Sequence, residues 1–403
     1  MTFKRSNLEK QVQSVPKDIA WCKRCVVSNQ RPRIIFNEEG ICSGCLNTDY
    51  KNNEVDWNAR EKELKDLLDE HRSKDGSWDV IVPSSGGKDS GYVAHQLKYE
   101  YGMNPLTVTW APLSYTDIGR QNLQANIDCG LSNILYTPNG RFQRKLARLC
   151  FEELGDAFHV FVLGQISYPF HMASKLGIKL VFYGENGEAE YAGDPEFADK
   201  SYKPSSEFLK QYFKGASFRD LLEYGIKNKD YLSEEDFSES DLTFYEPPTQ
   251  ALLEKNGILG KHFFSYYKKW VPQENYYYVV ENCGFKPNPF RTEGTYSKYA
   301  SLDDKMDGFH FYLRYIKFGL GRCMEDAAHE IRDGHLTRDE AIALMKRYEG
   351  EFPERYYQEF LDYLDINEDH FWKVVDSWRP DHLWEKKDNE WSFKHPIKSI
   401  DES

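Results

Sequence analysis

The chain has 403 residues, a length that predicts about two or three domains and a substantial core. Its formal net charge of −13 disfavours non-specific nucleic-acid binding, which depends on Lys and Arg, although a local basic patch is compatible with it. No run of about 18 apolar residues is present and residues 1–17 are polar, so neither a membrane span nor a secretory signal is expected. The eight cysteines then indicate a reducing cytoplasm rather than a disulfide framework.

Helix and strand patterns alternate from residue 57 onward. Helices are predicted over residues 57–71, 90–101, 118–129 and 142–154, with a further helix ending at Gly177, and strands over residues 80–82, 106–110, 134–136 and 180–183. Strands that alternate with helices of about 10–15 residues are typical of an α/β fold. We therefore expect a parallel sheet with helices on both faces.

The rest of the chain differs in character from one segment to the next. Residues 262–267 and 276–280 have the composition of strands, whereas the polar residues 380–403 are expected to be loose. A capping box formed by Thr337 and Glu340 opens a helix in the C-terminal part. The predicted domains are an N-terminal metal module (1–56), the α/β domain (57–190), an insertion or substrate-facing segment (191–300) and a mostly helical C-terminal region (301–403).

Four of the cysteines form two pairs near the N-terminus. Cys22 and Cys25 enclose two residues, as do Cys42 and Cys45, and 16 residues separate the pairs. Four thiolates in this spacing are typical of a tetrahedral, zinc-ribbon-like site that leaves no open position for catalysis. The sequence therefore predicts a structural zinc module, with an iron–sulfur cluster as the alternative.

A glycine-rich turn follows the first predicted strand. Residues 84–90 read Ser84, Ser85, Gly86, Gly87, Lys88, Asp89 and Ser90, and a predicted helix follows. Glycines allow the backbone to approach a polyphosphate, and the N–H groups at the start of the helix point toward it. The hydroxyls and Lys88 add donors, and Asp89 is expected to orient the loop or to help hold Mg²⁺. The pattern is not that of a Walker A loop.

This turn resembles the signature SGGxDS of the PP-loop ATP pyrophosphatase superfamily, which includes GMP synthetase, asparagine synthetase and tRNA-thiolating enzymes. The resemblance implies a HUP-like α/β fold and cleavage of ATP between its α and β phosphates, with Lys88, Asp89 and Ser90 in catalytic roles. It also implies that Gly184 and Trp110 lie at the nucleotide. Glu185 would then be a catalytic Mg²⁺ ligand, with a surface glutamate as the alternative.

Further segments resemble a narrower family, the N-acetyl sugar amidotransferases. They are Trp21-Cys-Lys-Arg-Cys25, Tyr183-Gly-Glu-Asn186, Arg291-Thr-Glu-Gly-Thr-Tyr-Ser297, Asp307-Gly-Phe-His310 and Lys317-Phe-Gly-Leu-Gly-Arg322. The resemblance implies that ATP adenylates the acetamido oxygen of a nucleotide-linked sugar and that ammonia displaces AMP. The product is an acetamidino sugar for bacterial surface polysaccharide, such as lipopolysaccharide O-antigen. The family works with glutaminase and cyclase-like subunits resembling those of imidazole-glycerol-phosphate synthase.

The cysteines give an independent indication of where ammonia comes from. A glutaminase needs a nucleophilic cysteine with a base, and enzymes with an N-terminal nucleophile carry it at the mature start, but here residue 2 is Thr2. Cys22 belongs to the metal cluster, and Cys129 and Cys150 fall on predicted helices. We therefore expect a partner chain to hydrolyse glutamine.

The narrower resemblance also suggests residues that contact the sugar substrate. The candidates are Asn186, Arg291, Thr295, Tyr296, Lys317 and Arg322. Arg and Lys suit phosphate or carboxylate groups, although ordinary surface or ion-pair roles are the alternative. Asp304, Asp307 and His310 are expected on one face of a helix, as a polar or metal-facing cluster or as a solvated stripe.

Two rival functions remain. A tRNA-thiolating enzyme also joins a cysteine-rich module to a PP-loop. The acidic net charge and the absence of a further CxxC pair among Cys129, Cys150, Cys283 and Cys323 stand against it. A zinc-ribbon interaction protein with a degenerate nucleotide fold is the non-enzymatic rival, and the intact loop stands against it.

Overall fold

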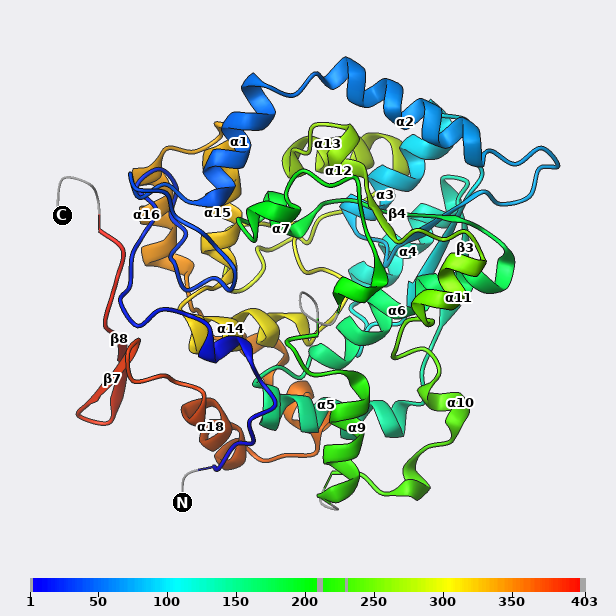
Figure 1. The fold of residues 1–403 in the computed structure, drawn as a ribbon. Helices are drawn as coiled ribbons and strands as arrows, with labels where there is room; N and C mark the ends of the chain where they lie inside the picture. Colours follow the sequence, from blue (N-terminus) through cyan, green and yellow to red (C-terminus); the bar gives the residue numbers. More distant parts are fainter. Residues whose placement is uncertain (1–2, 209–212, 229–230, 399–403) are drawn as a thin grey trace.

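The computed structural model describes residues 3–208, 213–228 and 231–398 (Figure 1). A six-stranded sheet forms its centre, in the order β3-β2-β1-β4-β6-β5. The strands are β1 (Val80–Pro83), β2 (Pro105–Trp110), β3 (Ser132–Tyr136), β4 (Leu180–Tyr183), β5 (Tyr202–Lys203) and β6 (Lys261–Phe263). All neighbouring pairs are parallel except β5 with β6. The predicted α/β class is confirmed.

Helices cover both faces of this sheet because its central strands are apolar on both sides. Ile81 of β1 belongs to one core with α5 (Gly140–Leu154) and α6 (His159–Leu176). Val80 and Val82, which point the other way, belong to a second core with α2 (Trp57–His71) and α3 (Lys88–His95). A short π-helical turn (Gln96–Glu100) extends α3, and α4 (Asp117–Asp128) lies beside α13.

Local sequence signals end these helices where expected. Asp56 accepts hydrogen bonds from Asn58 N and Ala59 N at the start of α2. Gly155 and Gly177 adopt left-handed conformations directly after α5 and α6. The predicted helices and strands between residues 57 and 183 are therefore confirmed to within about two residues at each end.

The segment after β4 is made of short elements. They are α7 (Gly187–Glu190), α9 (Phe218–Lys227), α10 (Glu239–Leu242), α11 (Gln250–Lys255), α12 (Phe264–Tyr267) and α13 (Pro272–Cys283), with 3-10 turns at Pro195–Phe197, Ser205–Glu207 and Glu234–Asp236. Strands β5 and β6 from this segment join the main sheet, so the sheet continues past residue 190. The domain boundaries themselves stay a prediction.

Two expectations for local structure were wrong. Residues 276–280 lie inside α13 rather than in a strand, because Pro272 starts a helix and Gly284 ends it in a left-handed conformation. The expected strand at 262–267 is β6 only as far as Phe263, after which α12 begins. In both places the β propensity of the tyrosines yields to helix-terminal signals and tertiary packing.

The C-terminal region is mostly helical, as predicted. Its helices are α14 (Asp307–Phe318), α15 (Arg322–Asp333), α16 (Arg338–Tyr348), α17 (Tyr357–Leu364) and α18 (Glu368–Ser377), with a 3-10 turn at Glu354–Tyr356. Thr337 and Glu340 form the predicted capping box of α16. Part of the 380–403 range that was expected to be loose forms a hairpin instead, β7 (Trp384–Lys387) and β8 (Glu390–Phe393), because Asp388 and Asn389 both accept positive φ in its turn. Residues 399–403 of that range lie outside the described residues.

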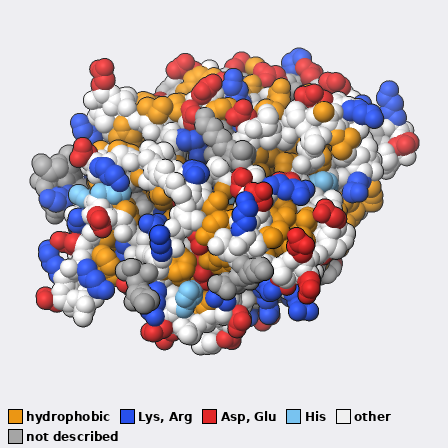
Figure 2. Space-filling model, turned by 60° about the horizontal axis from the view of Figure 1, so that its bottom comes forward, with side chains coloured by type: hydrophobic (Ala, Val, Ile, Leu, Met, Phe, Trp, Pro, Cys, Tyr) orange, Lys and Arg blue, Asp and Glu red, His pale blue; other side chains and the backbone are white. Residues whose placement is uncertain are grey.

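The N-terminal module packs against this C-terminal region rather than standing apart. Figure 1 shows the dark blue N-terminal loops beside α15 and α16. The module contains a 3-10 turn (Gln11–Gln13) and α1 (Ser43–Asn53). On the face in Figure 2, acidic and basic side chains are interspersed, with small hydrophobic patches between them. Within the described residues, no helix combines the length and the apolar character needed to cross a bilayer.

Candidate nucleotide site and metal centre

The glycine-rich loop joins the carboxyl end of β1 to the start of α3. Gly86 has φ +92°, and a Cβ there would lie 2.5 Å from the backbone nitrogen of Leu123 in α4. Gly87 is the extended residue before α3, and the nearest atom to a Cβ there would be Ser85 Oγ at 3.9 Å, an ordinary contact. The loop is therefore shaped by the need to bring its backbone against α4 while α3 points its first N–H groups at the space above the sheet.

Replacing Gly86 with alanine should lower the free energy of unfolding by about 2 kcal/mol or more, since it combines a left-handed backbone with a clash against backbone atoms. Gly140→Ala is the matched control, because a Cβ at Gly140 meets nothing within 4 Å. Urea denaturation of the two variants measures the difference. Equal stabilities would show that the loop relaxes without strain.

Hydrogen bonds within the loop hold its polar side chains in place. Ser90 Oγ lies 2.9 Å from Ser84 Oγ and donates to the Gly87 carbonyl at 3.1 Å. Lys88 pairs with its neighbour Asp89. The hydroxyls and the lysine are thus gathered at one edge of the sheet, as the sequence predicted.

A cavity of about 220 Å³ opens above this loop. Its lining includes Ser84, Ser85, Gly87, Asp89, Ser90, Trp110, Gly184 and Glu185, all predicted to contact nucleotide or Mg²⁺. Gly86 and Lys88 line an adjoining cavity on the other side of the loop. Residues Phe161, Gln165 and Pro169 of α6 also line the first cavity and were not predicted. The signal for them was weak: a glutamine and a proline inside an otherwise apolar helix.

Trp110 forms the wall of this cavity at the end of β2. Its ring packs against Tyr136, Tyr168 and Tyr245 at centroid distances of 5.1–6.1 Å. Gly164 of α6 makes this position possible, since a Cβ there would lie 2.0 Å from the indole. The buried indole N–H has no partner among the described residues, so it is a donor that a bound ligand can satisfy.

Two carboxylates face the same space. Burial raises the pKa of Glu185, and the nearby Asp89 carboxylate raises it further, while Lys261 and Lys88 oppose the shift. Asp89 pairs with Lys88 through Oδ2, and its Oδ1 lies 3.4 Å from Asn275 Nδ2. Two carboxylates that repel each other beside a phosphate-shaped loop have the donor chemistry that Mg²⁺ takes together with substrate phosphates.

The predicted substrate residues lie at different places. Arg322 lines the cavities that also contain Lys88 and Asp89, and its Nε lies 3.0 Å from Asp326. Thr295 Oγ1 donates to the same Asp326 at 2.6 Å. Arg322 is thus placed beside the phosphate loop, and Thr295 is linked to it through one carboxylate.

The other four candidates have intramolecular surroundings. Arg291 forms a two-pronged pair with Glu351 at 2.5 and 2.6 Å. Asn186 caps α7 and donates to the Phe197 carbonyl at 2.7 Å. The Tyr296 hydroxyl and Lys317 are also buried, and Lys317 lines a separate cavity described below. Substrate contact by these residues stays a prediction.

The expected cluster of Asp304, Asp307 and His310 was wrong. Asp304 precedes α14, and its carboxylate accepts hydrogen bonds from the backbone nitrogens of Leu113 (2.5 Å) and Ser114 (3.2 Å). It therefore ties the chain after β2 to the C-terminal region. Asp304 is off the helix because α14 begins only at Asp307, and His310 on α14 pairs with Asp156 at 3.0 Å.

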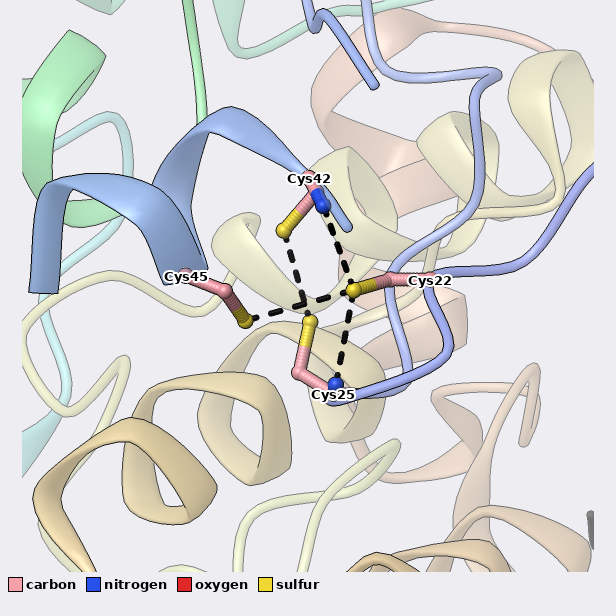
Figure 3. Close-up of side chains that lie close together, drawn as sticks. All are labelled: Cys22, Cys25, Cys42 and Cys45. Carbon is pink, nitrogen blue, oxygen red and sulfur yellow. Dashed lines mark hydrogen bonds between the residues drawn. The ribbon is translucent and has the colours of Figure 1, made fainter. Parts of the chain in front are cut away.

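The four N-terminal cysteines meet in one buried cluster. Figure 3 shows Cys22 and Cys25 from a loop and Cys42 and Cys45 from the start of α1 pointing toward one another. Their sulfurs lie within 4.8 Å of one another, with 4.0 Å between Cys22 and Cys45 and 3.6 Å between Cys25 and Cys42. Tetrahedral zinc thiolate geometry needs about 3.8 Å between sulfurs, so the donor set fits a four-coordinate metal.

The metal cluster shares its core with the C-terminal helices. The cysteines belong to the same buried cluster as Cys323 and Met324 of α15 and Ile342 of α16. Arg338 of α16 also donates to the Cys25 carbonyl at 3.2 Å. The helix that carries Arg322 therefore rests on the metal module.

Replacing Cys22 with serine should release the metal and lower the free energy of unfolding by more than about 4 kcal/mol, because its sulfur also accepts three backbone N–H groups. Cys129→Ser, at a half-buried site outside the cluster, should keep the metal. Elemental analysis and urea denaturation measure both effects. Metal-free wild-type protein that is folded and active would contradict a structural metal.

The chain is similar to several solved structures and, in its C-terminal region, to one protein family. No curated protein matches the chain significantly. Among solved structures, NMN synthetase from Francisella tularensis is 14% identical, with 57% of this chain and 88% of that chain covered and a TM-score of 0.28. NH3-dependent NAD synthetase from Campylobacter jejuni subsp. jejuni NCTC 11168 in complex with the nitrate ion is 17% identical. The match covers 50% of this chain and 95% of that chain, with a TM-score of 0.26.

A third similar structure is U34-tRNA thiolase NcsA from Methanococcus maripaludis with its 4Fe-4S cluster, at 13% identity, 78% and 86% coverage and a TM-score of 0.30. Residues 293–398 match a protein family described as LPS biosynthesis protein WbpG-like, C-terminal domain. That span contains Thr295, Tyr296, Lys317 and Arg322. Residues 293–398 of this chain are therefore similar to a WbpG-like C-terminal domain.

Proposed function

We propose that the protein is an ATP-dependent amidotransferase that converts the acetamido group of a nucleotide-linked sugar to an acetamidino group. ATP adenylates the amide oxygen, pyrophosphate leaves, ammonia attacks the imidate carbon, and AMP leaves with that oxygen. The observation that carries the proposal is the intact Ser-Gly-Gly-Lys-Asp-Ser loop at residues 85–90, set at the carboxyl edge of a parallel sheet. The WbpG-like domain supports a place in lipopolysaccharide biosynthesis.

The residues around the loop suit the charge changes of such a reaction. The backbone of Gly87 and Lys88 at the start of α3, with the Ser85 and Ser90 hydroxyls, offers donors to phosphate oxygens. Lys88 and Arg322 add positive charge where negative charge develops on the leaving pyrophosphate. Asp89 and Glu185 would hold Mg²⁺, which neutralises phosphate charge when it is bound.

The nucleotide base has a separate place in this scheme. Trp110 and Gly184 line the cavity at the ends of β2 and β4, and the aromatic surface of Trp110 suits a flat ring. The four-cysteine site would hold zinc as a structural metal, with an iron–sulfur cluster as the chemical alternative. Its contribution would be to hold α15, and thereby Arg322, in place.

Ammonia would come from a partner glutaminase, with a cyclase-like subunit between or beside the two chains. Burial raises the pKa of the Cys150 and Cys323 thiols, which disfavours the thiolate that a glutaminase needs. Cys283 lies beside Cys129, and neither lines the nucleotide cavity. The same arrangement disfavours the tRNA-thiolating alternative, which would need reactive sulfur chemistry at that cavity.

The test is a panel of nucleotide-linked acetamido sugars incubated with the protein, ATP, Mg²⁺ and an ammonium salt. Mass spectrometry should detect a product in which NH has replaced one oxygen. A sugar with a hydroxyl in place of the acetamido group is the matched control and should stay unchanged. Thiolation of a tRNA transcript together with inertness toward every acetamido sugar would refute the proposal.

A further inference from the structure

A second cavity, of about 160 Å³, shares no lining residue with the nucleotide cavity. It lies between the N-terminal segment, the corner that joins α5 to α6, and α14. Positively charged side chains dominate its wall: Arg31, Arg33, Lys214, Arg314 and Lys317, with His310 beside them. Asp156 is the carboxylate among the described lining residues. This wall is cationic in a chain whose net charge is −13.

Acidic partners hold several of these cations without lining the cavity. Arg33 Nη2 lies 2.8 Å from Glu188, and Lys317 Nζ lies 3.0 Å from Glu9. Lys214 and His310 share the single lining carboxylate, Asp156. The pairs keep the charges in place, but the surface that faces the cavity remains mostly donors.

Arg31 is the least compensated member of this wall. Its guanidinium donates no hydrogen bond to any residue that the structure describes, and its nearest carboxylate, Glu325 at 3.9 Å, is already paired with Arg314. Burial lowers the pKa of Arg31, the charges of Arg314 and Arg33 add to the shift, and Glu325 and Glu188 oppose it. A half-buried guanidinium that donates to no described residue is stabilised by an anion that accepts from it.

The backbone that carries these arginines is also strained. Arg33 has φ +69°, a left-handed conformation that is unfavourable for a non-glycine residue. The conformation persists while the side chain is held by Glu188. Strain kept at a residue on a ligand-sized cavity indicates a constraint beyond stability.

Glu325 connects this cavity with the phosphate loop. It lines the cavity, described above, that also contains Lys88, Asp89 and Arg322. Its carboxylate contacts Arg31 and Arg314 of the cationic wall. One side chain of α15 therefore borders both the loop and the cationic wall. A ligand with its anionic end on the wall would reach toward the loop past Glu325.

We propose that the cationic cavity binds the diphosphate group of the nucleotide-linked sugar. The assignment rests on the proposed function for the identity of the ligand, and on the wall itself for its chemistry. Guanidinium forks pair with phosphate oxygens, and Arg31 offers such a fork, while Arg33 from the same loop adds positive charge although Glu188 already accepts from two of its nitrogens. The acetamido group would then be held toward Lys88 and Asp89, where ATP activates it.

The probe is UDP, compared with uridine, titrated calorimetrically into wild type and into Arg31→Gln, which removes the least compensated charge of the wall. UDP should bind and uridine should not, and Arg31→Gln should weaken UDP binding about 10- to 100-fold. Arg141→Gln is the matched control, since Arg141 is exposed on α5. Ser90→Ala distinguishes UDP binding in the cationic cavity from UDP binding at the phosphate loop. Ser90 lines only the cavity at the loop, so this variant should leave UDP binding unchanged.

Equal UDP affinity in wild type and Arg31→Gln, or loss of UDP binding in Ser90→Ala instead, would overturn the assignment. If circular dichroism shows that Arg31→Gln is unfolded, Lys214→Gln takes its place with the same expectation, because His310 still pairs with Asp156. UDP binding does not depend on turnover. A protein that binds UDP through Arg31 but forms no amidine would contradict the proposed reaction and not this binding site.

Discussion

Replacing Ser90 with alanine should lower the rate of ATP-dependent turnover by about two to three orders of magnitude. The Ser90 hydroxyl lies at the start of α3 against Ser84 and the Gly87 carbonyl, at the edge of the nucleotide cavity. A donor held there gains most when charge builds on the leaving pyrophosphate, so the loss should fall mainly on kcat rather than on KM. Steady-state release of pyrophosphate measures the effect.

Ser132→Ala is the matched control for this variant. Ser132 is exposed at the start of β3, so its removal should leave kcat unchanged. Both variants should keep the wild-type free energy of unfolding, measured by urea denaturation, to within about 1 kcal/mol. A Ser90→Ala protein with wild-type kcat would remove the loop from the chemistry.

The isolated chain should form amidine from an ammonium salt and do almost nothing with glutamine. Among the described cysteines outside the metal cluster, Cys150, Cys283 and Cys323 are buried. A hydrogen bond with Cys283 lowers the pKa of Cys129, but its thiol donates to the Asn126 carbonyl and lies beside Cys283 rather than beside a base, so we expect no glutaminase nucleophile among them. The rate with ammonium should rise with pH, because free ammonia is the nucleophile and its share grows as ammonium loses its proton.

Mass spectrometric detection of the amidino product with each nitrogen source measures this division of labour. Cys129→Ser is the control for the half-buried thiol and should match wild type with ammonium. Adding a glutaminase partner should restore glutamine use. Efficient glutamine-dependent turnover by the purified chain, abolished in Cys129→Ser, would place the glutaminase on this chain.

Local signals made most of the candidate nucleotide site predictable. The apolar runs that become β1, β2 and β4 end beside the loop, Trp110 and Gly184, and parallel strands bring their carboxyl ends to one edge. The metal site was predictable for a similar reason, since the spacing of Cys22, Cys25, Cys42 and Cys45 limits which atoms can meet. In both cases short-range chemistry determines the geometry.

Contacts between distant segments were not predictable. Gln165 reaches the nucleotide cavity because Gly164 lets α6 pack on Trp110, a fact that appears only when both elements are placed. The cationic cavity likewise joins Arg31, Lys214 and Arg314, which no spacing rule connects. The tyrosines of α13 were misread because strand propensity outweighed the helix signals at Pro272 and Gly284.

The most direct test of the central claim is the identity of the nucleotide products. Phosphorus NMR of a reaction containing the protein, ATP, Mg²⁺, ammonium and an accepted acetamido sugar follows all phosphorus species at once. Cleavage on the residues 85–90 loop predicts AMP and pyrophosphate in amounts equal to the amidine formed. ADP and inorganic phosphate as the products that accumulate with amidine would contradict cleavage between the α and β phosphates, and with it the role given to the loop.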